Sequence, residues 1–149
     1  MGLLKNIQSH CQAQGIRLTE IREQVLNILI ASETACGAYE ILESLKIKRE
    51  NAEPMTVYRA LDFLCQHHLV HKIDALNRYV LCCHPNAKNC LLLICKKCGK
   101  KQEFHDDKLY EHLAFVSKKS CFSMESTSLD IYGLCQKCVS ESHETSKLS

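Results

Sequence analysis

The chain lacks the features that would place it in a membrane or in a secretion pathway. No apolar run approaches the roughly 20 residues that a helix needs to span a bilayer. The stretch before the first helix-like segment, Met1 to Leu4, is too short for a signal segment. A composition of 46% hydrophobic and 24% charged residues over 149 positions is typical of one or two small soluble domains. We therefore expect a cytoplasmic protein without a membrane partner.

The chain also has little excess charge and no hydrolase motif. A formal net charge of +2 is too small to indicate a nucleic-acid partner by itself, so any DNA binding must come from a local arrangement. A zinc hydrolase needs three protein ligands, an open water position and a general base, and no His-Glu-x-x-His or comparable motif occurs. We expect no enzyme and no small-molecule substrate.

Cysteine, in contrast, is abundant: 11 residues, of which four form two Cys-x-x-Cys pairs. The pairs are Cys95 with Cys98 and Cys135 with Cys138. Two such turns point four sulfurs at one metal, as in a closed tetrahedral zinc site. Disulfides and a redox dithiol are the alternatives, but the expected reducing compartment and the absence of a βαβ pattern favour zinc. The long segment between the pairs must then be a small subdomain that the metal closes.

The first half of the chain has the pattern of a winged helix. Apolar residues at helical spacing predict four helices, and two strand-like runs follow them. Thr19 can cap the second helix, and Pro54 suits the first turn of the fourth. The predicted helices cover residues 3–13, 19–31, a stretch after Gly37, and 54–67, and the predicted strands cover residues 69–73 and 78–82.

The fourth helix has the pattern of a DNA-reading helix. Its buried stripe consists of Val57, Ala60, Leu61 and Leu64. This leaves Thr56 and Arg59 facing outward and Tyr58 at the flank, so these three are the candidate DNA-binding residues. A plain α-helical bundle with a solvated face would show the same periodicity. The hairpin directly after the helix favours a wing, from which Lys72 or Arg78 can reach the phosphate backbone.

The second half reads as a separate α/β domain. Residues 83–89 contain a proline, two asparagines and no apolar pattern, which indicates a hinge. Strands are expected at 91–94, 101–104 and 122–132, with a helix capped by Asp106 and running to about 118. The expected organisation is a DNA-binding domain at 1–83, a hinge at 84–90, a metal-binding and dimerisation domain at 91–139, and a frayed polar tail at 140–149. The fold class is α+β.

These motifs together resemble one family. They are the stretches 17–19 and 56–61, Arg22, the segments 70–72 and 79–82, and the two Cys-x-x-Cys pairs. From about residue 9 to residue 139, in the same order, the chain resembles the ferric uptake regulator family and, within it, the bacterial zinc uptake regulators. The resemblance implies a homodimer in which each chain has a winged helix and a C-terminal α/β dimerisation domain. It also implies repression of zinc-uptake genes at AT-rich palindromic operators.

The resemblance implies roles for particular residues. Tyr58 and Arg59 match the family's recognition-helix contacts to DNA. The four cysteines of the two pairs, which are Cys95, Cys98, Cys135 and Cys138, match its structural zinc ligands. Each chain is then expected to hold one structural and one regulatory zinc ion.

The regulatory zinc site is expected around the hinge. His71, Cys82 and Glu103 match sensing ligands of zinc uptake regulators, and their imidazole, thiolate and carboxylate suit a four-coordinate zinc. The family's fourth ligand is usually a histidine shortly before the first Cys-x-x-Cys pair, where this chain has none. Cys90 is the expected replacement and His84 its substitute. Each of these residues also has a plain structural interpretation, as a surface or core side chain.

The expected mechanism is selection by zinc of the arrangement that fits DNA. An iron- or peroxide-responsive regulator of the same family is the nearest alternative, and the match at Cys82 argues against it. A zinc-binding module without DNA affinity is an alternative of a different class. Salt-dependent binding to duplex DNA separates that module from a regulator.

Overall fold

The computed structural model describes the backbone of residues 2–82, 89–125 and 127–146, and side chains within these ranges except those of residues 89, 90, 128 and 143–146. The chain divides into two compact units, Met1–Pro85 and Asn86–Ser149. Among the described residues, no helix is long and apolar enough to cross a bilayer. The two units are described separately below.

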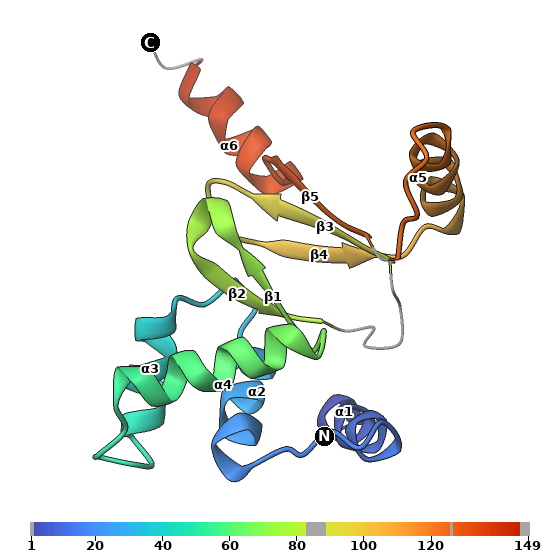
Figure 1. Ribbon diagram of the computed structural model, residues 1–149. Helices are drawn as coiled ribbons and strands as arrows, with labels where there is room; N and C mark the ends of the chain where they lie inside the picture. The colour runs from blue at the N-terminus through green and yellow to red at the C-terminus, as the bar shows by residue number, and fades with distance from the viewer. Residues whose placement is uncertain (1, 83–88, 126, 147–149) are drawn as a thin grey trace. The chain divides into compact units, whose positions relative to one another are not determined.

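The N-terminal unit consists of four helices followed by a β-hairpin (Figure 1). The elements are α1 (Gly2–Ala13), α2 (Glu20–Ala31), α3 (Ala38–Lys46), α4 (Pro54–Gln66), β1 (Val70–Ile73), the 3-10 turn η1 (Asp74–Leu76) and β2 (Arg78–Leu81). Thr19 is the N-cap residue of α2, but its side chain makes no capping hydrogen bond. Pro54 begins α4, where the missing N–H costs no helical hydrogen bond. The expected helices and hairpin are all present.

One hydrophobic core joins these helices to one face of the hairpin. All four stripe residues of α4 are buried, with Leu61 and Leu64 fully enclosed. They pack in one cluster with residues of α2 and α3 and with Val70, Tyr79 and Leu81 of the hairpin. Burial of a leucine side chain contributes about 1.5–3 kcal/mol, so this stripe fixes which face of α4 remains in water.

The hairpin is antiparallel, with Val70 opposite Leu81 and Ile73 opposite Arg78. Asn77 closes the turn with a φ of 50°, a left-handed conformation that asparagine tolerates better than most residues. A third segment pairs with β2, because Cys36 and Tyr79 exchange two backbone hydrogen bonds of 2.8 and 2.9 Å. The segment that leads into α3 is therefore attached to the wing.

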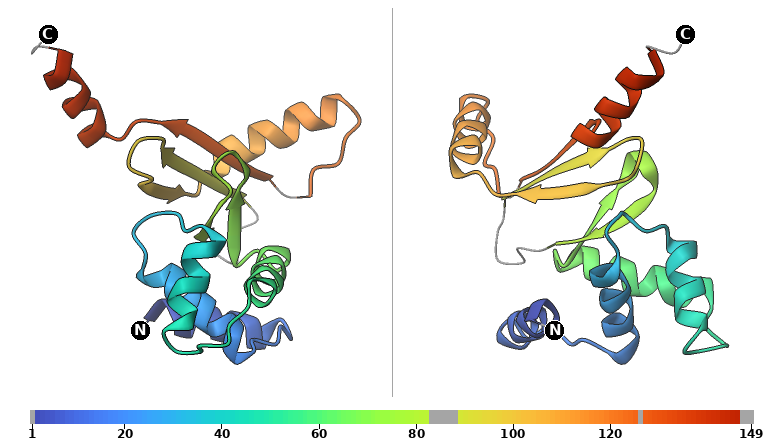
Figure 2. Two further views of the ribbon diagram at one scale, coloured as in Figure 1. Left: turned by 90° about the vertical axis from the view of Figure 1, so that its left-hand side faces the viewer. Right: turned by 180° about the vertical axis from the view of Figure 1, so that it is seen from behind.

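The C-terminal unit is a three-stranded sheet with two helices. Its elements are β3 (Asn89–Cys95), β4 (Lys101–Phe104), α5 (Asp107–Lys119), β5 (Thr127–Gly133) and α6 (Gln136–Ser146). The strand order is β4-β3-β5, with β3 antiparallel to β4 and parallel to β5. The two helices leave opposite ends of the sheet (Figure 2). Because β3 is central, it carries the continuous apolar run that the sequence shows at 91–94.

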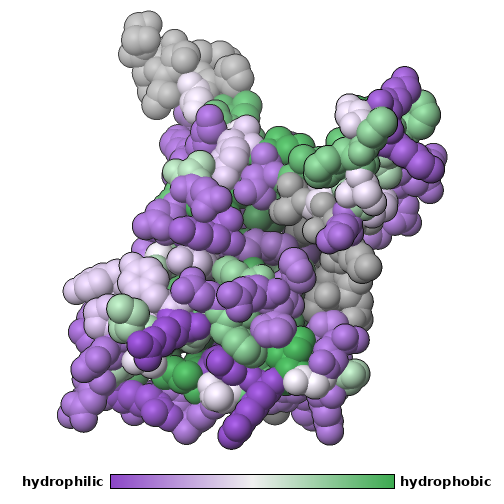
Figure 3. Space-filling model, in the orientation of Figure 1, coloured by the Kyte–Doolittle hydropathy of each residue, from purple (hydrophilic) through white to green (hydrophobic). Residues whose placement is uncertain are grey.

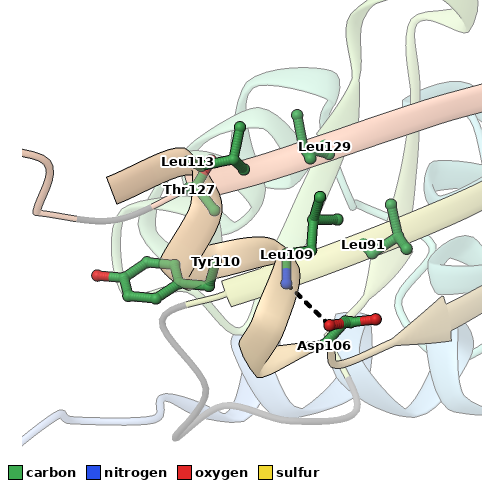
Figure 4. Close-up of a pocket in the computed structure, with 7 residues that line it drawn as sticks. All are labelled: Leu91, Asp106, Leu109, Tyr110, Leu113, Thr127 and Leu129. Atoms are coloured by element: carbon green, nitrogen blue, oxygen red, sulfur yellow. Dashed lines mark hydrogen bonds between the residues drawn. The ribbon is translucent and has the colours of Figure 1, made fainter. Parts of the chain in front are cut away.

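Helix α5 packs against one end of one face of the sheet. The Asp106 side chain caps the helix by accepting a hydrogen bond of 2.9 Å from the Leu109 N–H. Leu109 and Leu113 of α5 face Leu91 and Leu129 of the sheet across a small hollow (Figure 4). No residue of α5 is buried, so this unit has a thin core. Its buried described side chains are Leu92, Ile94, Cys95 and Cys138.

Two expectations about the C-terminal unit were wrong in detail. The strand expected from residue 122 begins at Thr127, because Phe122 and Cys121 are still held by backbone bonds to Ser117 and Lys118 at the end of α5. The tail expected to fray from residue 140 is helical to Ser146. An ion pair of 3.3 Å between Lys97 and Glu141 ties this helix to the first Cys-x-x-Cys turn. The α+β class itself is confirmed.

Candidate metal centre and nucleic-acid interface

The sheet brings the two Cys-x-x-Cys turns to the same end of the C-terminal unit. Strands β3 and β5 run parallel and in register, so that Cys95 at the end of β3 lies beside Gly133 at the end of β5. The first turn follows β3 directly, and the second follows β5 after one residue. Parallel strands in register have their C-terminal ends side by side, and therefore the two Cys-x-x-Cys motifs become neighbours although they are distant in sequence.

Each turn has a backbone that aims its sulfurs inward. In the first, the Gly99 N–H donates to the Cys95 carbonyl at 2.9 Å, and Gly99 has a φ of 72°, a left-handed conformation that suits glycine. In the second, Cys138 lies in the first turn of α6, where the Val139 N–H donates to the Cys135 carbonyl. Residues three apart at a helix start share a face, so both sulfurs of this pair point the same way.

The four sulfurs form one compact cluster. All four, from Cys95, Cys98, Cys135 and Cys138, lie within 4.8 Å of one another. Zinc–sulfur bonds of about 2.3 Å at tetrahedral angles separate neighbouring sulfurs by about 3.8 Å. The Cys98 and Cys135 sulfurs are 3.7 Å apart, which fits that geometry. The cluster can hold a structural zinc ion.

Hydrogen bonds and burial give these thiols different proton affinities. The Cys135 N–H donates to the Cys95 sulfur at 3.4 Å. That bond, together with N–H groups of Cys98 and Lys97, lowers the pKa of Cys95 from its usual 9.0 to about 6. The Cys138 N–H likewise lowers the pKa of Cys135. Burial raises the pKa of Cys138 to about 12. At neutral pH the cluster is thus already part thiolate, the form that binds metal.

Two of the expected regulatory ligands lie on the hairpin. His71 on β1 is opposite Val80, and Cys82, two residues after Val80, directly follows β2. Since side chains alternate between the faces of a strand, Val80, Cys82 and His71 share one face, with His71 and Cys82 as diagonal neighbours. Cys82 is 2% exposed and His71 is half-buried. The hairpin therefore presents an imidazole and a thiol together.

Two further expected regulatory ligands, Glu103 and Cys90, belong to the C-terminal unit. Glu103 lies on β4 opposite Leu92 and is half-buried. Cys90 is placed on β3, but its side chain is outside the described residues, as is all of His84. The choice between Cys90 and His84 as fourth ligand stays a prediction.

The polar face of α4 carries the candidate DNA contacts. Tyr58 is 44% exposed, Arg59 is exposed, and Thr56 is half-buried, all in the first half of the helix. The buried stripe described above holds this face toward solvent. An exposed aromatic ring and an exposed guanidinium side by side can meet the base edges and phosphates of a duplex.

Of the two wing residues offered for a phosphate contact, Lys72 and Arg78, the second is already paired within the protein. Arg78 does not extend freely as a phosphate contact: its guanidinium bonds to the Glu40 carboxylate at 2.9 and 3.2 Å and to the Ala35 carbonyl at 2.6 Å. Lys72 is exposed and lies 3.8 Å from the Asp74 carboxylate. Sequence reasoning missed the Glu40 contact because 38 residues separate the two side chains.

The fold agrees with comparisons to known proteins. The model of the ferric uptake regulator family matches residues 13–132. The chain belongs to the ferric uptake regulator family. Among characterised members, the zinc uptake regulation protein of Escherichia coli (strain K12) is 33% identical over 143 residues, covering 92% of this chain and 81% of that protein.

Solved structures of ferric uptake regulator family members have the same fold. A zinc uptake regulator complexed with zinc and DNA superposes with a TM-score of 0.86 at 31% identity, over 95% of this chain and 96% of that one. The holo form of XcZur superposes with a TM-score of 0.81 at 35% identity, over 93% and 98% of the two chains. The fold expectation drawn from the family resemblance is therefore confirmed.

Proposed function

We propose that this chain is a zinc-responsive transcriptional repressor that binds operator DNA as a zinc-loaded dimer. The observation that carries the proposal is a winged helix with Tyr58 and Arg59 exposed on α4. The same chain has a four-cysteine cluster and belongs to the ferric uptake regulator family. The relatives named as zinc uptake regulators, one of them complexed with zinc and DNA, support zinc as the effector and duplex DNA as the partner. The protein acts in the cytoplasm, without catalysis, at AT-rich palindromes of zinc-uptake genes.

The four-cysteine cluster is the proposed structural zinc site. The thin core of the C-terminal unit supports this role, because a unit with few buried apolar side chains needs another source of stability. A closed tetrahedral zinc contributes folding free energy directly. Zinc here would cross-link the end of β3 to the start of α6.

His71, Cys82 and Glu103 are the proposed regulatory zinc ligands, with Cys90 or His84 as the fourth. The shared hairpin face of His71 and Cys82 supports the pairing of an imidazole with a thiolate, a donor set that suits zinc better than harder metals. Glu103 lies on β4 of the C-terminal unit and adds a carboxylate to the proposed set. The proposed complement is one structural and one regulatory ion per chain.

The C-terminal unit is the proposed site of homodimer formation. Strand β5 is an edge strand, and Ile131 on it is 50% exposed while sharing a sheet face with Leu93 and Leu129. Phe115 and Val116 of α5 are 56% and 48% exposed. Figure 3 shows such apolar side chains at the surface among the charged residues of α5. An unpaired edge beside exposed apolar side chains fits a second copy of this chain.

Zinc-dependent DNA binding tests the proposal. Fluorescence anisotropy of a labelled AT-rich palindromic duplex is measured at graded free zinc with the wild type, His71→Ala and Cys82→Ser. We expect the wild type to bind more tightly as regulatory zinc is filled, and both variants to lose most of that dependence. By linkage, DNA must also tighten zinc by the same factor, which competition with a chelator measures.

A matched control keeps the result specific. Cys121→Ser removes an exposed thiol that is not among the proposed ligands. It should behave as wild type. Wild-type zinc dependence in His71→Ala and Cys82→Ser would reject the ligand assignment. Absence of salt-dependent duplex binding in the wild type would instead favour a zinc-binding module without DNA affinity.

A further inference from the structure

The guanidinium of Arg78 joins the wing to the start of helix α3. Nη2 donates to Glu40 Oε1 at 2.9 Å, and Nη1 donates to Glu40 Oε2 at 3.2 Å and to the Ala35 carbonyl at 2.6 Å. Two parallel N–H bonds to one carboxylate are the geometry in which arginine binds most specifically. One side chain of the hairpin thus holds both a side chain and a backbone group of another segment.

The Glu40 carboxylate is fixed from a second direction. Its Oε2 also accepts the Gly37 N–H at 3.0 Å, which completes the capping of α3. The backbone pair between Cys36 and Tyr79 lies next to these contacts in sequence on both strands. Segment 35–40 is therefore attached to β2 by backbone and side-chain bonds together.

Both attached elements have functions in the proposed repressor. The hairpin carries His71 and Cys82, and α3 packs against α4, whose Tyr58 and Arg59 are the candidate DNA contacts. An arginine on the wing has two possible uses: a direct bond to phosphate, or a bond that sets the angle of the wing against the helices. The contacts of Arg78 favour the second, because three of its five N–H groups already bond to Glu40 and Ala35.

We propose that Arg78 and Glu40 form a clamp that positions the wing against α3 and α4 for DNA binding, so that Arg78 acts through Glu40 and not as a phosphate ligand. The inference rests on the proposed DNA-binding function. Removing the charge of Glu40 distinguishes a clamp from a direct phosphate contact by Arg78. Neutralising Glu40 should strengthen DNA binding if Arg78 binds phosphate, since a negative charge is removed and the arginine is freed. It should weaken binding if the clamp is what matters.

A double-mutant cycle on the zinc-loaded full-length protein tests the clamp. Arg78→Ala, Glu40→Gln and the double variant are compared with wild type by anisotropy on the operator duplex across a salt series. Glutamine is chosen because it still accepts the Gly37 N–H in the capping box. We expect each single variant to bind about tenfold more weakly, and the double variant no more weakly than either single one, as for residues that act as a unit.

The salt series gives an independent readout. Loss of a phosphate contact lowers the slope of log affinity against log salt by about one per site, whereas loss of a positioning contact leaves the slope unchanged. Arg78→Lys extends the comparison, because lysine keeps a charge for phosphate but cannot fill the bidentate geometry with Glu40. We expect Arg78→Lys to bind nearly as weakly as Arg78→Ala, with the slope of wild type.

The control is Glu20→Gln, which removes the exposed carboxylate of another Arg–Glu pair in this unit, 2.6 Å from Arg49. It should leave operator affinity unchanged. Thermal unfolding and zinc content confirm that each variant is folded. Unchanged or tighter binding by Glu40→Gln, or additive effects in the cycle, would overturn the clamp. If the wild type itself fails to bind duplex DNA, the proposed function fails and not the clamp alone.

Discussion

The Cys98 sulfur lies 3.7 Å from the Cys135 sulfur, although 37 residues separate them in the chain. The parallel pairing of β3 with β5 produces this proximity, because the C-terminal ends of the two strands lie side by side. One of these thiols is exposed and the other half-buried, and their spacing is that of neighbouring sulfurs around a tetrahedral zinc ion.

Replacement of Cys98 should release the structural zinc and destabilise the C-terminal unit. Cys98→Ser leaves three thiolates, and structural zinc supplies an apparent free energy of about 10–16 kcal/mol in small zinc domains at pH 7. We expect loss of one zinc per chain and loss of the C-terminal unit's cooperative unfolding. Elemental analysis and calorimetry measure these.

Cys121→Ser is the matched control, because Cys121 is also an exposed thiol of the same unit but lies outside the cluster. It should keep full zinc content and stability. A Cys98→Ser protein with unchanged zinc content would contradict the structural assignment.

Zinc affinity of the cluster should fall with decreasing pH. Because the pKa of Cys95 is lowered from 9.0 to about 6, its thiolate persists through neutral pH and is lost as the pH falls through about 6. Cys138, with a pKa raised to about 12, keeps its proton at neutral pH and must release it to bind metal. We expect affinity to rise with pH above 6 and to fall more steeply below it, where Cys95 also holds a proton.

Chelator competition across this range measures the apparent affinity, and calorimetry in buffers of different ionisation enthalpy counts the released protons. Cys121→Ser should follow the same curve. A pH-independent affinity between about 5 and 8 would show that the four thiols do not bind the ion.

A charge on the exposed face of the C-terminal sheet should prevent dimer formation. Ile131→Glu places a carboxylate on edge strand β5, in the region proposed for the second copy. Burial of an unpaired charge at an interface costs several kcal/mol, so we expect a monomer by light scattering and weakened operator binding.

Ile47→Glu is the comparison, since Ile47 is even more exposed, at 85%, but belongs to the N-terminal unit. It should remain dimeric. A dimeric Ile131→Glu protein would place the interface elsewhere.

Truncation of Arg59 should weaken DNA binding without affecting metal content or folding. Arg59 is exposed on α4, so Arg59→Ala removes a contact and no packing. We expect a loss of about 1–3 kcal/mol, with relaxed preference at one base pair if it reads a base edge and a lower salt slope if it binds phosphate. Anisotropy on operator variants across a salt series distinguishes these results.

Lys108→Ala removes an exposed cation from α5 in the C-terminal unit and should bind as wild type. Equal losses in both variants would mean that α4 has no special role and that only total charge matters.

The local sequence determined the elements and several of their ends. The stripe of Val57, Ala60, Leu61 and Leu64 fixed the buried face of α4, because apolar residues at helical spacing can leave water on only one side. Pro54 and Asp106 marked helix starts, since a missing N–H and a capping carboxylate act within one turn. The paired Cys-x-x-Cys motifs predicted that four cysteines gather, as their sulfurs do.

Only the tertiary structure decided contacts between distant segments. It placed Cys95 beside Gly133 through strand pairing, and it paired Arg78 with Glu40, where sequence reasoning offered Lys72 or Arg78 for a phosphate contact. The structure also showed residues 140–146 to be helical, with Glu141 paired to Lys97 of the first Cys-x-x-Cys turn. Periodicity reports which face of an element is buried, whereas the partner of a long polar side chain depends on where the folded chain brings opposite charge within reach.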